Sequence, residues 1–237
     1  MGMMDFEDRV VVVTGAGGNL GSAVAHAFEA RGARLALVDL DRDILGAAFG
    51  AEDDNRLLLA VDLLDRDRVY AAASTIVDRF GQIDVLCNIA GGFRMGEPVH
   101  ETSERTWDFL MDVNARSVIH AAGAVVPHML RAGSGRIVNV GANAALRGGA
   151  RMGAYCAAKG AVIRLTESMS AELREHGINV NCVLPSIIDT PENRSAMPKA
   201  DPKRWVAPTD LAAVILFLSS DAAHAVHGAA IPVTGLS

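Results

Sequence analysis

Short apolar runs alternate with longer amphipathic segments along almost the whole chain. The apolar runs are rich in Val, Ile and Leu and contain few polar interruptions. Near-continuous runs of this kind are typical of strands in a parallel sheet that is covered on both faces. Seven segments are therefore predicted to be strands: 9–15, 33–40, 56–63, 83–91, 135–142, 178–185 and 228–235.

The segments between these runs have the length and amphipathic character of helices. Helices are predicted over 20–32, 65–81, about 104–131, 152–176 and 208–220, with Gly32, Gly81 and Gly177 at C-cap positions. Repeated strand–helix units imply right-handed crossovers. We therefore expect an α/β fold: a Rossmann-type doubly wound parallel sheet of about seven strands with helices on both faces, in a single domain over residues 1–237.

Composition excludes several classes of function. The 237 residues carry a net charge of −6, which argues against a nucleic-acid-binding surface because such surfaces need clustered basic residues. No apolar run reaches the roughly 18 residues of a membrane span, and the first residues do not form a signal peptide. The spacing of Cys87, Cys156 and Cys182 fits neither a disulfide framework nor a zinc site, so we expect buried thiols and no metal. A cytoplasmic protein with a small-molecule substrate is favoured.

The first predicted strand runs through "VVVVTGAGGNLG" into a glycine turn and then a helix. Such a turn lets the backbone approach a pyrophosphate at the positive end of the helix, although a glycine cluster can also be only a tight turn. Asp39 ends the next strand, 18 residues after Gly21, where its carboxylate can accept hydrogen bonds from a ribose. The same carboxylate would repel a 2′-phosphate, so NAD(H) is favoured over NADP(H); Arg42 weakens this preference without reversing it. Asp39 could otherwise be a solvated strand-end residue.

Tyr155 and Lys159 lie one helical turn apart after the fifth predicted strand. A free tyrosine has a pKa of about 10, and a nearby ammonium lowers it. Tyrosine as proton donor or acceptor, with lysine tuning it and holding a ribose, suits hydride transfer. The spacing alone also fits an ordinary helix with a surface lysine.

The sequence as a whole resembles the short-chain dehydrogenase/reductases. The resemblance covers essentially the full length and rests on Asp39 and on the segments "TGAGGNLG" (14–21), "VDL" (61–63), "CNIAGG" (87–92), "MDVNARS" (111–117), "YCAAK" (155–159) and "INVNCVLPSIIDTP" (178–191). It implies that Tyr155 and Lys159 are catalytic and that Asn114 holds a water linking the lysine to solvent. The resemblance implies a cofactor site formed by Gly15, Gly18, Asn19, Leu20, Gly21, Asp39, Asp62, Leu63, Asn88, Ala90, Gly91, Tyr155, Lys159, Pro185, Ile188 and Thr190.

Three positions depart from the family pattern. Asn19 stands where the glycine turn usually has Gly, and Pro185 is followed by Ser186 rather than Gly. The family's catalytic serine falls thirteen residues before the tyrosine, where this chain has Ala142. That serine normally hydrogen-bonds the substrate oxygen, so its absence puts ordinary alcohol–carbonyl chemistry in doubt.

The dihydropteridine reductase branch is similar at four separate places. It shares a G-x-x-G-x-L-G turn, matched by Gly15, Gly18, Leu20 and Gly21, and a "GA-x-AAL" strand end, matched by "GANAAL" (141–146). It also shares "AGG" followed by an aromatic residue, here Phe93, and an insertion similar to 189–201. The resemblance implies that Phe93 covers a flat heterocycle and that 189–208 forms a substrate lid, the alternative being a surface excursion without substrate contact.

Three functions remain open. The leading hypothesis is an NADH-dependent reductase of a quinonoid dihydropterin or another flat conjugated substrate, which needs a hydride and a proton from Tyr155 but no serine. The second is a carbonyl reductase or secondary alcohol dehydrogenase in which Asn143, or a water, replaces the serine; Asn143 could also be a solvent-facing loop residue. The third is a catalytically inactive NAD-binding protein. Ala-rich segments at 112–131 and 152–176 favour a homodimer or homotetramer.

Overall fold

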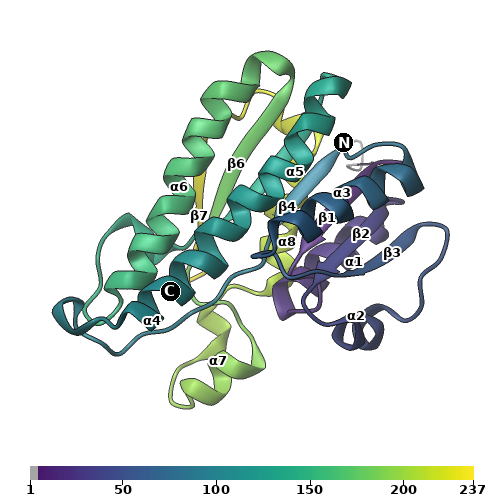
Figure 1. Cartoon of the computed structure of the whole chain (residues 1–237). Coiled ribbons are helices and arrows are strands. Elements are labelled where there is room, and N and C mark those ends of the chain that lie inside the picture. The colour runs from purple at the N-terminus through teal and green to yellow at the C-terminus, as the bar shows by residue number, and fades with distance from the viewer. Residues whose placement is uncertain (1–4) are drawn as a thin grey trace.

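The structure, a computed structural model, describes residues 5–237. Its seven strands form one parallel sheet in the order β3-β2-β1-β4-β5-β6-β7 (Figure 1). The strands are β1 (Val10–Thr14), β2 (Arg34–Asp39), β3 (Arg56–Ala60), β4 (Val85–Asn88), β5 (Gly135–Val140), β6 (Ile178–Pro185) and β7 (Ala230–Val233). Each lies within a predicted apolar run, and the predicted fold class is confirmed.

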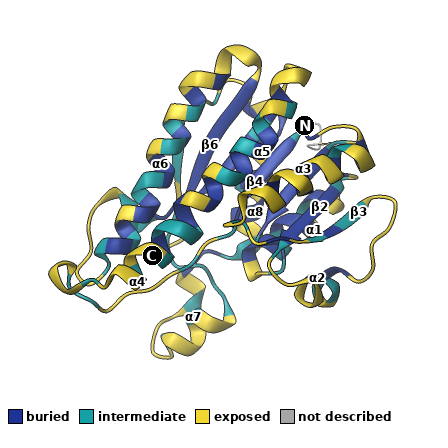
Figure 2. Ribbon diagram, viewed as in Figure 1, coloured by how far each residue is buried: buried dark blue, intermediate teal, exposed yellow. Residues whose placement is uncertain are grey.

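Helices cover both faces of the sheet, and the strands between them are the most buried part of the molecule (Figure 2). One face packs against α1 (Asn19–Glu29), α2 (Arg42–Phe49) and α8 (Pro208–Ser219). The other face packs against α3 (Arg66–Phe80), α5 (Ser117–Ala132) and α6 (Gly153–Leu173). Two shorter helices, α4 (Glu104–Met111) and α7 (Pro191–Ala196), lie beyond the carboxyl ends of the strands. Across residues 5–237, the structure contains no helix that is both long and apolar enough to span a membrane.

Short helical turns complete the connections. They are η1 (Val99–Glu101), η2 (Asp112–Arg116), η3 (Asn143–Leu146), η4 (Arg174–His176), η5 (Pro202–Arg204) and η6 (Asp221–Ala223). All are 3₁₀ turns except η2, which is a π-helix.

The structure corrects three sequence predictions about helices. The continuous helix expected over about 104–131 is divided by η2 into α4 and α5, because Asn114 turns its side chain back onto the helix backbone. A helix that the sequence pattern did not predict, α2, begins at an Asp41 cap that accepts from the Asp43 N–H. Gly32, expected as a C-cap, lies two residues beyond Ala30, which caps α1. The expected cap at Gly81 is present, with a left-handed backbone.

The strand order reverses direction at β1, whose neighbours are β2 on one side and β4 on the other. In an open α/β sheet, the crevice at the carboxyl ends of the strands beside such a switch point binds ligands. The glycine turn after β1, Asp39 at the end of β2 and Ala90 after β4 all lie at this edge.

Candidate active site

A cavity of about 740 Å³ occupies this crevice. Nine residues predicted to bind the cofactor line it: Gly15, Gly18, Leu20, Gly21, Asp39, Asp62, Leu63, Ala90 and Gly91. Leu40 and Ile44, which the sequence analysis did not single out, add apolar wall on the side of β2 and α2. The cavity is therefore built from segments far apart in the chain, and its walls include a backbone turn, a carboxylate and apolar side chains.

The glycine turn packs too closely for side chains at three of its positions: Gly15, Gly21 and Gly17, where a Cβ would overlap the Ile44 side chain. Gly15 has a φ of +65°, and a Cβ there would lie 2.8 Å from the Cα of Ala90. A Cβ at Gly21 would overlap the carbonyl oxygen of Gly15. Gly18 differs, because the nearest atom to a Cβ would be 3.4 Å away and the position is otherwise open. The turn thus leaves open space at the N-terminus of α1, which suits a pyrophosphate.

Asp39 is half-buried, and both of its carboxylate oxygens accept backbone hydrogen bonds. Oδ2 accepts from the Gly17 N–H at 2.9 Å and Oδ1 from the Leu40 N–H at 2.7 Å. Arg42 points elsewhere: its guanidinium donates to the Leu58 carbonyl and pairs with Glu52 at 3.1 Å. The Asp39 carboxylate therefore faces the cavity, and Arg42, which the sequence suggested as a cation that could weaken the preference for NAD(H), does not pair with it.

Tyr155 and Lys159 both project from the first turns of α6. Lys159 is buried, and its Nζ donates to the carbonyl oxygen of Val140 at 2.8 Å; burial lowers its pKa to about 8. Burial also raises the pKa of Tyr155 to about 12. The ring of Phe93 packs edge-on against Tyr155, with ring centroids 4.8 Å apart. The pKa of Tyr155 is therefore raised by burial rather than lowered by the Lys159 ammonium as the sequence led us to expect, and the tyrosine is protonated at neutral pH.

Asn114 is buried, and it orders the segment after β4. Its Nδ2 donates to the carbonyls of Gly92 and Leu110, and its Oδ1 accepts from the Gly92 N–H. A Cβ at Gly91 would lie 2.9 Å from the Asn114 Oδ1 and 3.1 Å from the Lys159 Nζ. The side chain of Asn114 thus holds the backbone next to Gly91, and both Asn114 and Lys159 lie close to that glycine. The predicted water relay through Asn114 stays a prediction.

Ala142, at the position of the missing serine, is buried directly after β5. Asn143 begins η3 and is half-buried, and within residues 5–237 its side-chain amide makes no hydrogen bond. Ala142 offers only a methyl group, so the nearest side chain in the sequence that could donate in place of the serine is that of Asn143.

The residues predicted beside the nicotinamide lie after β6. Pro185 ends β6, Ile188 pairs with Val206, and the Thr190 hydroxyl caps α7 by accepting from the Asn193 N–H at 3.2 Å. The two ends of the predicted lid, 189–208, are thereby joined at its base, where the Asp189 N–H donates to the Val206 carbonyl.

Two contacts at the site have no signal in the sequence pattern. Asn19 is exposed, and its Nδ2 donates to the Glu192 carboxylate at 3.0 Å, which links the glycine turn to the lid. Asn88, expected to line the cofactor, is instead buried beneath the cavity. It donates to Asn139, which donates to Thr166 on α6, each bond being 2.8 Å long. A polar residue within an apolar run, such as Asn88, indicates a buried hydrogen bond, but the sequence does not identify its partner.

Comparison with known proteins shows the family to which the chain belongs. Residues 9–201 match the short chain dehydrogenase family. D-threitol dehydrogenase from Mycolicibacterium smegmatis is 34% identical over 97% of this chain and 92% of its own length. Meso-2,3-butanediol dehydrogenase from Serratia marcescens is 34% identical over 98% and 95%.

Solved structures agree. Levodione reductase superimposes with a TM-score of 0.88 at 31% identity, covering 97% of each chain. NAD⁺-bound xylitol dehydrogenase superimposes with a TM-score of 0.89 at 28% identity, covering 97% of this chain and 99% of that one. With a family match over most of its length and relatives above 30% identity across nearly all of it, the protein belongs to the short-chain dehydrogenase/reductase family of oxidoreductases.

Proposed function

We propose that the protein is an NADH-dependent reductase of a flat conjugated acceptor, with a quinonoid dihydropterin as the first candidate. One observation carries this proposal: a buried methyl group, Ala142, replaces the serine, while Tyr155 keeps its proton at neutral pH. An electron-poor conjugated acceptor needs a hydride and a proton but no hydroxyl to polarise a carbonyl. Phe93, 54% exposed and packed against Tyr155, offers an aromatic surface for a planar ring.

The cavity fits a dinucleotide, with NAD(H) preferred. The open space at the glycine turn accepts a pyrophosphate, and the Asp39 carboxylate can bind a ribose diol but would repel a 2′-phosphate. Arg42 is engaged by Glu52 and by the Leu58 carbonyl, so it does not offset this repulsion. NAD also occurs in the name of a relative, the NAD-dependent glycerol dehydrogenase of Listeria innocua, which is 31% identical.

NADH, when bound, supplies the hydride. Tyr155 donates its proton to the reduced acceptor, which balances the two electrons and two hydrogen atoms gained. Lys159, one helical turn away, is charged below a pH of about 8, and its ammonium would favour the phenolate left on Tyr155. Reprotonation from solvent restores the resting site.

The test is NADH oxidation by the purified protein with quinonoid dihydropterin generated in situ, using Tyr155→Phe and the control Tyr70→Phe. Tyr70 lies on α3, away from the cavity. We expect turnover that falls by about 10²-fold or more in Tyr155→Phe only. Equal rates in both variants, or no turnover with any conjugated acceptor, would exclude the proposal.

A second candidate is a secondary alcohol or diol dehydrogenase in which Asn143 binds the substrate oxygen. It is favoured by the names of the relatives, which include D-threitol and meso-2,3-butanediol dehydrogenases, whereas no dihydropteridine reductase is among those named here. Oxidation of diols that is lost in Asn143→Ala would select it. Tight NADH binding without turnover of any substrate would select a catalytically inactive binding protein.

We also propose that the chain forms a homodimer or homotetramer. Trp107 on α4 and Ile119 on α5 are 45% and 52% exposed, and a subunit contact over these helices would cover both side chains. Sedimentation equilibrium would give the assembly state directly, and a monomer at micromolar concentration would exclude both.

A further inference from the structure

A second cavity, of about 210 Å³, lies beside the reacting tyrosine. The segment between β4 and α4 forms one wall and the start of α6 forms the other. Arg94 lines the first wall and directly follows Phe93, whereas Ala154 lines the second and directly precedes Tyr155. Each wall of the cavity thus contains the chain neighbour of one of the two rings in the Phe93–Tyr155 contact.

Two arginines face this cavity from different loops, Arg94 and Arg151. The Arg94 guanidinium stacks 3.7 Å from the centre of the Phe109 ring. The Arg151 Nη1 donates to the Gly96 carbonyl at 3.2 Å, and the Gly96 N–H donates back to the Arg151 carbonyl at 2.9 Å. Within residues 5–237, neither arginine forms an ion pair with a carboxylate.

The backbone at Arg151 adds a second sign of constraint. Its φ is +61°, a conformation that side chains other than glycine rarely adopt. The reciprocal hydrogen bonds with Gly96 hold it there. A charged residue kept in a strained conformation beside an active site indicates a functional constraint rather than a packing one.

Glu97 is the carboxylate that lines the cavity, and it is already engaged. It accepts from the Ser103 N–H and hydroxyl and from the Thr106 hydroxyl at the start of α4. These hydrogen bonds, led by the one from the Ser103 backbone, together with the positive charge of Arg94, lower the pKa of Glu97, so it is ionised at neutral pH. The cavity thus holds two cations and one anion, and α6 begins at the same place without a side-chain cap, which adds positive potential.

We propose that this cavity binds an anionic group, a carboxylate, sulfonate or phosphate, at the end of the substrate away from the reacting atoms. The inference rests on the proposed function, because it takes Tyr155 as the reacting centre. Arginine suits such groups because its planar fork donates two parallel hydrogen bonds. Phe93 and Met95, 54% and 59% exposed, would contact the apolar body between the two ends. The expected substrate is flat, apolar in its middle and negatively charged at one end.

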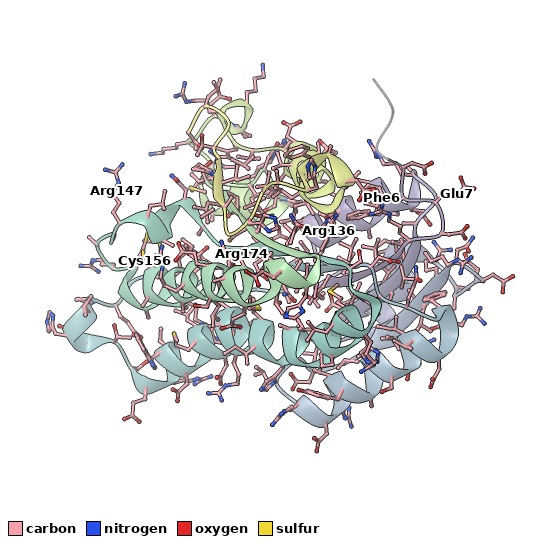
Figure 3. The ribbon with its side chains drawn as sticks, turned by 90° about the horizontal axis from the view of Figure 1, so that it is seen from above. Phe6, Glu7, Arg136, Arg147, Cys156 and Arg174 are labelled. Atoms are coloured by element: carbon pink, nitrogen blue, oxygen red, sulfur yellow. The ribbon has the colours of Figure 1, made fainter. Side chains whose placement is uncertain are left out.

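Binding of benzoate, benzamide and sulfate to the NADH-loaded protein tests this proposal by calorimetry. Benzoate and benzamide have the same shape and differ in charge, and sulfate is an anion without an apolar body. The variants are Arg94→Gln and Arg151→Asn, the latter because Asn tolerates a positive φ. Arg147→Gln is the control, since Figure 3 shows Arg147 pointing away from the ribbon near the start of α6 and it does not line the cavity. Thermal unfolding checks that each variant is folded.

We expect benzoate to bind about tenfold or more tightly than benzamide and than sulfate, and this preference to disappear in Arg94→Gln and Arg151→Asn but not in Arg147→Gln. Equal affinities for benzoate and benzamide would overturn the anion site. Sulfate binding as tightly as benzoate would overturn its assignment to the substrate. None of these measurements requires turnover, so a failure to reduce conjugated acceptors excludes the proposed function without deciding the anion site.

Discussion

The Nζ of Lys159 donates a 2.8 Å hydrogen bond to the carbonyl oxygen of Val140, the last residue of β5. This bond fixes the start of α6 against the end of the strand that leads to Ala142. Tyr155, one helical turn earlier, is consequently held beside the wall that has lost its serine hydroxyl. The geometry supports proton donation by a tyrosine without the serine partner, and several consequences can be measured.

The pH dependence of the two reaction directions should differ. Burial raises the pKa of Tyr155 to about 12, so the protonated form required for reduction is saturated between pH 6 and 8. The phenolate required for oxidation is scarce there and increases about tenfold per pH unit. Single-turnover rates should therefore be flat for reduction and rise steeply for oxidation. A reduction rate that falls tenfold per unit over this range would show a proton donor of much lower pKa.

Ala142→Ser should restore alcohol–carbonyl chemistry. The backbone at Ala142 is extended, with φ −156° and ψ 146°, so a serine fits without strain. Its hydroxyl would supply the missing hydrogen bond to a carbonyl oxygen, and we expect kcat/KM for ketones or secondary alcohols to rise about tenfold or more. Ala144→Ser, in the neighbouring turn, is the control. Unchanged or lower kcat/KM in Ala142→Ser would show that the wall at this position does not contact the substrate oxygen.

Gly91→Ala should impair catalysis more than folding. The new Cβ would press on the Asn114 Oδ1 and the Lys159 Nζ, at 2.9 Å and 3.1 Å, and shift the lysine to which we assign a catalytic role. We expect kcat to fall about tenfold or more. Gly46→Ala in α2 is the matched control, because no atom lies within 4 Å of its Cβ. That control should raise the free energy of unfolding by about 0.5–1 kcal/mol and leave kcat unchanged. Wild-type kcat in Gly91→Ala would contradict the prediction.

Glu192→Gln should tighten NADH binding. The Glu192 carboxylate contacts Asn19 at the turn expected to hold the pyrophosphate, and hydrogen bonds from its own backbone, Thr190 and Asn19 lower its pKa. Removing this negative charge should lower the Kd for NADH about threefold at low salt, with a smaller gain at high salt because of screening. Fluorescence titration measures both, with Glu175→Gln as an exposed control. An unchanged Kd for NADH in Glu192→Gln, or a change of the same size at low and high salt, would mean that Glu192 does not face the cofactor phosphates.

Deletion of residues 192–203 tests the lid. Because the ends of the segment are joined by the Ile188–Val206 pairing, the deletion shortens a loop whose base is already closed. We expect the KM for the acceptor to rise about tenfold or more, with a smaller change in the Kd for NADH. Steady-state kinetics and fluorescence titration give the two constants. Unchanged kinetics would show a surface excursion rather than a lid.

The sequence by itself determined the sheet and the main candidates for the site. A strand formed by a continuous apolar run such as 9–15 has apolar side chains on both of its faces, so both faces must be buried. This requirement can be recognised from the residues of the run alone. Gly15 and Gly21 are likewise readable from the chain, because the turn between a strand and a helix has the same steric demands wherever it occurs. The sequence places Tyr155 and Lys159 one helical turn apart, but their catalytic roles, and the position of the missing serine at Ala142, come from the resemblance to the short-chain dehydrogenase/reductases and stay predictions.

Only the tertiary structure decided which distant side chains meet. Asn114, whose bond back to the Leu110 carbonyl accompanies the division of the helix expected over about 104–131, also bonds to Gly92, on a segment 22 residues earlier in the chain. Arg94 and Arg151 enter one cavity because the loops after β4 and β5 leave adjacent strands of the sheet. In the sequence these two arginines cannot be distinguished from ordinary surface residues. The hydrophobic periodicity indicates which face of a helix or strand is buried, but not which residues of different elements come into contact.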